Sequence, residues 1–95
     1  MRLFIVAYDI ADDDRRGDVA DVLLSWGRRI QYSVFECSLG ETSEARLRTQ
    51  LDGLIDHLAD QILFFDLGPL EGRARDAVRA LGKPYTLPKN DAIVI

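Results

Sequence analysis

The fold follows most directly from one stretch near the N-terminus, Leu3-Phe4-Ile5-Val6-Ala7-Tyr8-Asp9. Six consecutive apolar residues precede the aspartate, and such a run is too short for a helix. It is typical of a strand buried on both faces. Residues 62–67 (ILFFDL) have the same character. The sequence therefore predicts two strands of one sheet that are apolar on both faces and need apolar cover on each side.

The region after the first strand predicts a helix. Residues 12–14 are three aspartates, which supply N-cap chemistry and favourable negative charge for a first helical turn. Gly27 stands where a left-handed residue commonly ends a helix. Between these signals one apolar face recurs at helical spacing, formed by Val19, Val22, Leu23 and Trp26.

Residues 28–39 are rich in β-branched and aromatic side chains, which predicts two short strands with a tight reversal near Tyr32 and Ser33. Residues 40–43 (GETS) then break the pattern and cap a second helix. The expected core stripe of that helix is Leu47, Leu51, Leu54, Ile55 and Leu58. Beyond residue 67 we expect a short helix over 73–81, closed by Gly82 and Pro84, and a final strand over 92–95.

This order, strand–helix–strand–strand–helix–strand, predicts a single α+β domain over residues 1–95, a ferredoxin-like βαββαβ sandwich with an extra C-terminal strand. Its two helices cover one face of the sheet, so the second apolar face requires another cover. An identical sheet from a second subunit is the simplest one, which predicts a homodimer through the sheet faces. In this arrangement the C-terminal extension, residues 67–95, completes the partner's sheet.

Composition narrows the functional classes. The chain is 47% hydrophobic and 29% charged, as expected for a soluble globular protein, and the N-terminal apolar run is too short to cross a membrane. We therefore expect a cytoplasmic protein. Cys37 is the only cysteine, which excludes an intrachain disulfide and a cysteine cluster for zinc. The net charge of −4 argues against general polyanion binding, so contact with nucleic acid would need a local basic patch.

Asp9 is the most informative polar residue, because it stands at the carboxyl end of a buried strand, on a rigid element. Mg²⁺ commonly binds one or two carboxylates, together with water and substrate phosphate. Two Asp9 side chains across a dimer axis would form a metal site suited to phosphodiester chemistry. The alternative is that Asp9 merely caps the following loop, and spacing alone favours neither.

Two arginine pairs are candidates for contact with phosphate, Arg15–Arg16 in the first turn of the first helix and Arg28–Arg29 at the start of the second strand. The plainer reading of the first pair is ion pairing with Asp12 and Asp13, and the plainer reading of the second is a solvated strand edge. Three aromatic residues at strand spacing are able to stack on bases or, as is more common, to fill the core or an interface: Tyr8, Tyr32 and Phe35.

The combination of three motifs resembles the small endonuclease family of the CRISPR spacer-acquisition module, CRISPR-associated protein two. The motifs are Tyr8-Asp9-Ile10, then Arg15-Arg16, then residues 27–36 (GRRIQYSVFE). The resemblance implies a ferredoxin-like homodimer in which Asp9 is the catalytic, metal-binding residue. It further implies that Arg16 and Arg29 are the motif arginines that contact nucleic acid, and that Tyr8, Ser33 and Phe35 support the site.

The resemblance also implies a Mg²⁺-dependent endonuclease, with Mn²⁺ as a possible substitute, that acts on RNA or DNA. Its implied protein partner is the adaptation integrase, CRISPR-associated protein one. Two other functions stay open at this stage. One is a non-catalytic scaffold that bridges integrase dimers on DNA, and the other is a toxin-like ribonuclease, because a fold alone does not fix a function.

Overall fold

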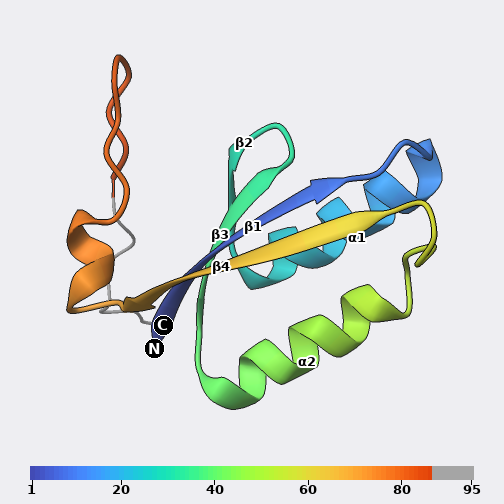
Figure 1. The fold of residues 1–95 in the computed structure, drawn as a ribbon, viewed down its shortest axis with the longest axis horizontal. Helices are drawn as coiled ribbons and strands as arrows, with labels where there is room; N and C mark the ends of the chain where they lie inside the picture. The colour runs from blue at the N-terminus through green and yellow to red at the C-terminus, as the bar shows by residue number, and fades with distance from the viewer. Residues whose placement is uncertain (87–95) are drawn as a thin grey trace.

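The computed structural model describes residues 1–86 and contains the expected order of elements (Figure 1). In chain order these are β1 (Arg2–Asp9), α1 (Asp13–Trp26), β2 (Arg28–Gln31), β3 (Val34–Leu39), α2 (Glu41–Asp52), β4 (Gln61–Pro69) and the 3₁₀ helix η1 (Arg73–Asp76). The four strands form one sheet in the order β2-β3-β1-β4, and every neighbouring pair is antiparallel. The predicted α+β, ferredoxin-like βαββαβ architecture is confirmed.

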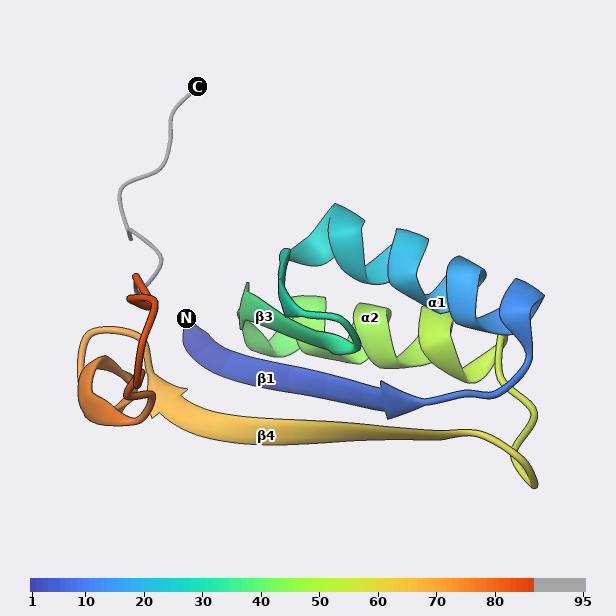
Figure 2. The same cartoon turned by 90° about the horizontal axis from the view of Figure 1, so that it is seen from above.

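Both helices lie on the same side of the sheet (Figure 2). The core between them is built from alternate residues of β1 and β3 and from the apolar stripes of the two helices. Its fully or almost fully buried members include Phe4, Val6, Tyr8, Phe35, Cys37, Leu39, Val19, Leu23, Leu47 and Leu51. Burying apolar side chains contributes about 25 cal/mol for each Å² removed from water, so this layer holds the helices to the sheet.

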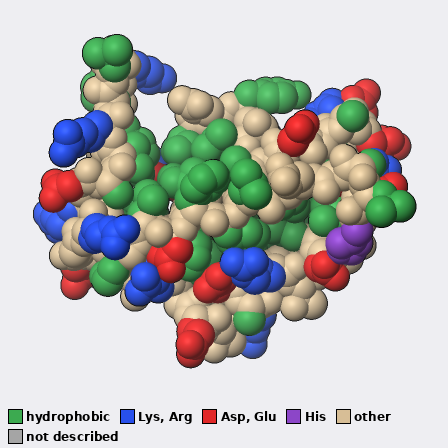
Figure 3. Space-filling view, in the orientation of Figure 1, with side chains coloured by type: hydrophobic (Ala, Val, Ile, Leu, Met, Phe, Trp, Pro, Cys, Tyr) green, Lys and Arg blue, Asp and Glu red, His purple; other side chains and the backbone are tan. Residues whose placement is uncertain are grey.

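On the opposite side of β1 and β4 the described part of the chain places neither α1 nor α2, as the sequence predicts. Ile5 and Ala7 of β1 stand opposite Phe65 and Leu63 of β4, while Val34 of β3 flanks Ala7 on the other side. Leu63 and Phe65 remain 44% and 48% exposed. We call these five residues the uncovered face. Figure 3 views the molecule from this side and shows hydrophobic side chains gathered over the middle of the sheet.

The start of α1 agrees with the sequence, but the role of Gly27 does not. Asp12 is the N-cap and its carboxylate accepts a hydrogen bond of 2.9 Å from the backbone N–H of Arg15. Gly27 has φ −165° and is therefore extended rather than left-handed. A Cβ at this position would lie 2.0 Å from the carbonyl oxygen of Glu36. The glycine is required because β3 passes directly against it.

The second helix is shorter than its apolar pattern predicts. α2 ends at Asp52, and Leu54 and Ile55 reach the core from the turn that follows. Leu58 is 99% exposed, so its placement in the core was wrong. The physical reason is the loop itself, in which the Asp60 carboxylate accepts from the backbone N–H of Asp56 at 2.9 Å and so closes a turn in place of another helical one.

The expected helix over 73–81 was also wrong, because only Arg73–Asp76 is helical and as a single 3₁₀ turn. Ala74 packs with Leu3 and Leu70 in a small separate cluster, whereas Leu81 is fully exposed and leaves a longer helix without an apolar stripe. The final strand over 92–95, with its pairing to a partner's sheet, lies outside the described residues. Within residues 1–86, helices are too short or too polar to cross a membrane.

Candidate functional site

Asp9 is the last residue of β1, opposite Gln61 of β4. Strand alternation puts its side chain on the same side of the sheet as Ile5 and Ala7, which belong to the uncovered face. Asp9 is exposed, and within residues 1–86 its carboxylate has no hydrogen bond or ion pair. Since Asp12 caps α1, the loop-capping alternative for Asp9 finds no support.

A surface hollow of about 340 Å³ opens beside this carboxylate. Its walls come from the end of β1, the first turn of α1 and the turn between β2 and β3. We call it the Asp9 hollow, and its lining residues are Tyr8, Asp9, Ile10, Arg16, Tyr32 and Ser33. The backbone N–H of Tyr8 donates to the carbonyl of Ser33 at 3.1 Å, which fixes the β2–β3 turn against the strand end. The sequence-predicted residues Tyr8, Asp9, Arg16 and Ser33 thus meet at one place.

Arg16 is the cation of the Asp9 hollow. Its Nη1 donates to the carbonyl oxygens of Ile10 and Ala11, each at 3.1 Å, and its Nη2 donates to Asp13. The hydrogen bond to Asp13, followed more weakly by the neighbouring Tyr32 hydroxyl, raises the pKa of Arg16 above its ordinary value. Arg16 therefore holds the β1–α1 connection in shape and keeps a positive charge beside Asp9.

Arg15 points to a different place and does not line the Asp9 hollow. Its Nε and Nη2 donate to the two carboxylate oxygens of Asp60, at 2.7 and 3.2 Å. The hydrogen bond from Arg15, and then that from the backbone N–H of Asp56, lower the pKa of Asp60. The Asp60 side chain is fully buried. Arg15 thus links α1 to the loop before β4. The sequence did not reveal Asp60 as its long-range partner.

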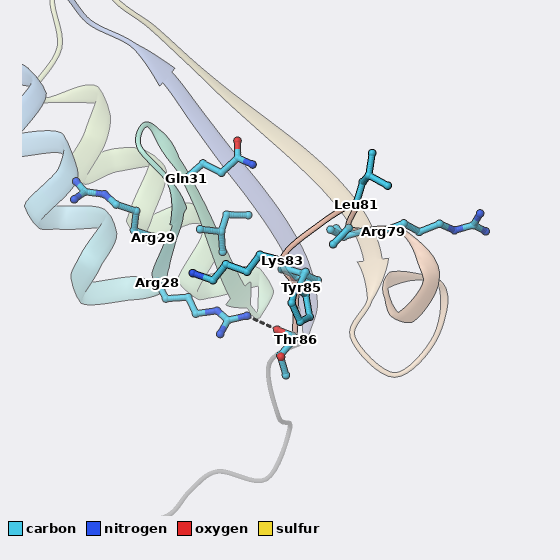
Figure 4. A pocket seen from close by; sticks show the side chains of 12 residues that line it. Arg28, Arg29, Gln31, Arg79, Leu81, Lys83, Tyr85 and Thr86 are labelled. Atoms are coloured by element: carbon cyan, nitrogen blue, oxygen red, sulfur yellow. Dashed lines mark hydrogen bonds between the residues drawn. The ribbon is translucent and has the colours of Figure 1, made fainter.

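Arg28 and Arg29 line a second hollow of about 500 Å³, separate from the first. It lies between β2 and the segment 78–86, which also contributes Arg79 and Lys83. In Figure 4, Lys83 reaches toward β2 while Arg79 extends away from it. We call this hollow the basic groove. The Arg29 guanidinium stands 5.1 Å from the ring centre of Phe35. The two predicted arginine pairs therefore occupy different parts of the molecule.

The three aromatic candidates differ clearly in the exposed fraction of their side chains. Tyr8 and Phe35 are 7% and 0% exposed and stack on each other at 6.1 Å between ring centres. They support the strand end from the core and present no ring face to a base. Tyr32 is 73% exposed and borders the Asp9 hollow.

Glu36 is a residue whose importance sequence reasoning missed. It is only 2% exposed, and it accepts hydrogen bonds from Arg28 Nε and from the Tyr85 hydroxyl. Burial, followed by the hydrogen bond to Glu36, raises the pKa of Tyr85 to about 12. Arg28 also donates to the carbonyl of Thr86. A glutamate in the largely apolar β3 was the available signal, because an acid buried in such a strand needs a partner.

Residues 1–86 of one chain supply an incomplete metal site. Within residues 1–86 there is no group of three acidic, histidine or cysteine side chains able to hold a metal ion. Asp9 does offer the ligand type that Mg²⁺ prefers, an exposed carboxylate to which residues 1–86 provide no competing partner. The residues present therefore fit a shared site, in which one carboxylate comes from each of two chains.

Comparison with known proteins identifies the relatives of this chain. Residues 1–74 match the model of the family described as CRISPR associated protein Cas2. A protein named "CRISPR-associated endoribonuclease Cas2 3" from Synechocystis is 39% identical over 95 residues, covering 99% of this chain and 100% of the relative.

Two solved structures extend the comparison. The crystal structure of Streptococcus pyogenes Cas2 superposes with a TM-score of 0.70 at 29% identity, covering 84% of this chain and 99% of the other. A chain of a partial Cas6-RT-Cas1–Cas2 complex has the same fold, with a TM-score of 0.67 at 23% identity and coverage of 83% and 90%.

Proposed function

The chain belongs to the CRISPR associated protein Cas2 family, and from this premise we propose that it is a metal-dependent endonuclease of CRISPR adaptation in which Asp9 serves phosphodiester cleavage. The observation that carries the proposal is the Asp9 carboxylate itself, exposed, without a partner in residues 1–86 and held at the end of a rigid inner strand. The Synechocystis relative is named an endoribonuclease.

The active species in this proposal is a homodimer formed through the uncovered face. A small domain buries a modest share of its surface, so exposed apolar residues such as Leu63 and Phe65 favour association. A two-fold contact joins the same patch on both chains. Asp9 borders that patch, so the two Asp9 carboxylates meet in the dimer when the two-fold axis passes close to the end of β1.

Asp9 and the second chain's Asp9 would hold one Mg²⁺, or Mn²⁺ in its place. When bound, the ion supplies charge neutralisation on the phosphodiester and lowers the pKa of a bound water. The chain's own residues orient the substrate around it. Arg16 offers positive charge beside Asp9, while the β2–β3 turn, fixed through Ser33, closes the side of the hollow. Tyr8 and Phe35 keep the strand end rigid from below.

The basic groove would bind the rest of the nucleic acid. Arg28, Arg29, Arg79 and Lys83 line it, and phosphate neutralisation by such side chains is the main source of nucleic-acid affinity. Since the net charge of the whole chain is −4, binding should depend on this local surface. Arg15 is engaged with Asp60 and contributes to the proposed site only through the fold.

The decisive experiment is a nuclease assay on single-stranded RNA and on double-stranded DNA, with Mg²⁺, Mn²⁺ or EDTA. We expect metal-dependent cleavage that Asp9→Asn lowers by at least about 100-fold, since removal of one essential group typically has an effect of this order. Asp21→Asn is the matched control, an exposed carboxylate on α1 outside the Asp9 hollow. Equal cleavage by the Asp9 variant, or none by the wild type with either metal, would refute the enzymatic proposal.

The dimer is tested separately, by sedimentation of the Phe65→Glu variant. A charge in the middle of the uncovered face should give monomers and abolish cleavage while the helical circular dichroism signal stays unchanged. A wild-type protein that sediments as a monomer would remove the shared metal site.

A non-catalytic scaffold that docks the integrase Cas1 on DNA is the second candidate. It is favoured by the lack, within residues 1–86, of a group of three acidic, histidine or cysteine side chains able to hold a metal ion. For this function Asp9→Asn should support integration of new spacers as well as the wild type does, whereas Phe65→Glu should abolish it. Reconstituted integration with purified integrase separates the two candidates.

A further inference from the structure

Tyr32 is the aromatic side chain that the Asp9 hollow presents to solvent. It is 73% exposed at the tip of the β2–β3 turn, between Gln31 and Val34. The other two aromatic residues of this region, Tyr8 and Phe35, are buried and already stacked on each other. A ligand in the hollow would therefore meet one free ring.

The fold gives no reason for a tyrosine at this position. Tight hairpin turns favour asparagine and glycine, which adopt positive φ. Within residues 1–86 no residue other than glycine has a positive φ, so this turn has ordinary backbone geometry that most residues adopt. The ring is not buried in the core either, and its exposed apolar surface adds little to stability.

The turn that carries the ring is nevertheless anchored beside Asp9, and Asp9 and Tyr32 line the same hollow. Ser33, the next residue, accepts the backbone hydrogen bond from Tyr8 and so anchors the turn to the end of β1. The Tyr32 hydroxyl also faces Arg16, the cation of the same hollow. One small space thus combines a carboxylate for a metal, a guanidinium for a phosphate and an aromatic face.

We propose that Tyr32 stacks on an unpaired base next to the phosphate bound at Asp9, and that it sets a preference for single-stranded over duplex nucleic acid. Every base has a π face, so such stacking tolerates any sequence. In a duplex both faces of each base are already stacked on neighbouring bases, which leaves Tyr32 no base to contact. The proposal deepens the proposed function and rests on it for the position of the phosphate.

The first test measures binding, so that it does not depend on cleavage. Fluorescence anisotropy of a labelled single strand and of the matching duplex is recorded with the Asp9→Asn protein, then with Tyr32→Ala and Tyr32→Phe added to it. We expect Tyr32→Ala to weaken binding of the single strand by about 5- to 150-fold, the range of one stacked base. Duplex binding should change less than twofold, and Tyr32→Phe should retain the wild-type preference.

Leu24→Ala is the matched control, since Leu24 is an exposed apolar residue of α1 outside the hollow. A single strand that carries 2-aminopurine gives a second readout, because stacking on the ring quenches its fluorescence. An unchanged single-strand affinity in Tyr32→Ala, or an equal loss for single strand and duplex, would overturn the proposal. If single-strand binding falls as expected while the wild type cleaves nothing, the stacking role stands and the enzymatic proposal fails.

Discussion

Two carboxylates on the same side of the sheet have opposite surroundings. Asp9 lies at the end of β1, exposed and without a hydrogen-bond or ion-pair partner in residues 1–86. Glu36 lies in the middle of β3, 2% exposed, and accepts from Arg28 and from Tyr85. Residues 28, 36, 85 and 86 form what we call the Glu36 cluster.

The difference in burial and hydrogen bonding indicates different roles for the two carboxylates. A buried carboxylate is costly unless hydrogen bonds satisfy it, so Glu36 is tolerated because its partners are in place. Those partners join β2, β3 and the segment that ends at Thr86, which gives the cluster a structural role. Asp9 stabilises nothing comparable, and its free oxygens are available to a metal ion. The Glu36 cluster should therefore determine stability, and the Asp9 hollow should determine chemistry.

The largest effect on stability is expected where the backbone of β3 passes Gly27. In Gly27→Ala the new Cβ would lie 2.0 Å from the carbonyl oxygen of Glu36, and backbone cannot move aside as a flexible side chain does. We expect the free energy of unfolding to fall by about 3 kcal/mol or more. Urea denaturation measures this change.

Gly17→Ala is the matched control for this substitution. Gly17 is an exposed glycine inside α1, and a Cβ there has nothing within 4 Å. Alanine should raise the free energy of unfolding by about 0.5–1 kcal/mol. A Gly27→Ala protein as stable as Gly17→Ala would show that β3 does not pack against this residue.

Local patterns in the sequence were sufficient for the architecture. The apolar run before Asp9, the Asp12 cap and the periodic faces of both helices are signals within a few residues of one another, and each predicted its element, although α2 ends earlier than its apolar pattern does. The uncovered face also followed, because two strands were apolar on both sides while only two helices were available. Asp9, Arg16 and Ser33 line one hollow because each stands near the end of a predicted element, while their roles in a site stay predictions.

The failures have a common cause in partners that are distant in sequence. The expected ion pairs of Arg15 with Asp12, at 3.8 Å, and of Arg16 with Asp13 are present. The sequence did not reveal that Arg15 makes a shorter contact with Asp60, 45 residues away. Glu36 depends on Tyr85, 49 residues away. Leu58 continued a helical pattern that the turn around Asp60 interrupts. Periodicity reports which face of an element is apolar, but it carries no information on which polar groups meet across the fold.

A smaller loss of stability is expected from Glu36→Gln. The substitution keeps the size of the side chain and removes the charge that accepts from Arg28, and hydrogen bonds to charged groups contribute about 1.5–3 kcal/mol. Since the amide oxygen still accepts one hydrogen bond, we expect the free energy of unfolding to fall by about 1–2 kcal/mol. A lower melting temperature would show this loss.

Tyr85→Phe removes one hydrogen bond of the same cluster and keeps the ring. The free energy of unfolding should therefore fall by a smaller amount, about 1 kcal/mol. If neither variant melts below the wild type, the Glu36 cluster does not hold the segment that ends at Thr86.

The smallest effect on stability is expected from Asp9→Asn, the same carboxylate-to-amide change at the open site. Because no group in residues 1–86 depends on this carboxylate, the free energy of unfolding in EDTA should stay within about 0.5 kcal/mol of the wild type. Added Mg²⁺ should then raise the melting temperature of the wild type alone, since a ligand that binds only the folded state stabilises it by an amount that grows with the logarithm of the ligand concentration above its dissociation constant. Melting curves at one fixed protein concentration measure both quantities. A loss above about 1 kcal/mol in EDTA would mean that Asp9, like Glu36, is held for the fold, and the contrast between the two carboxylates would no longer identify the reactive one.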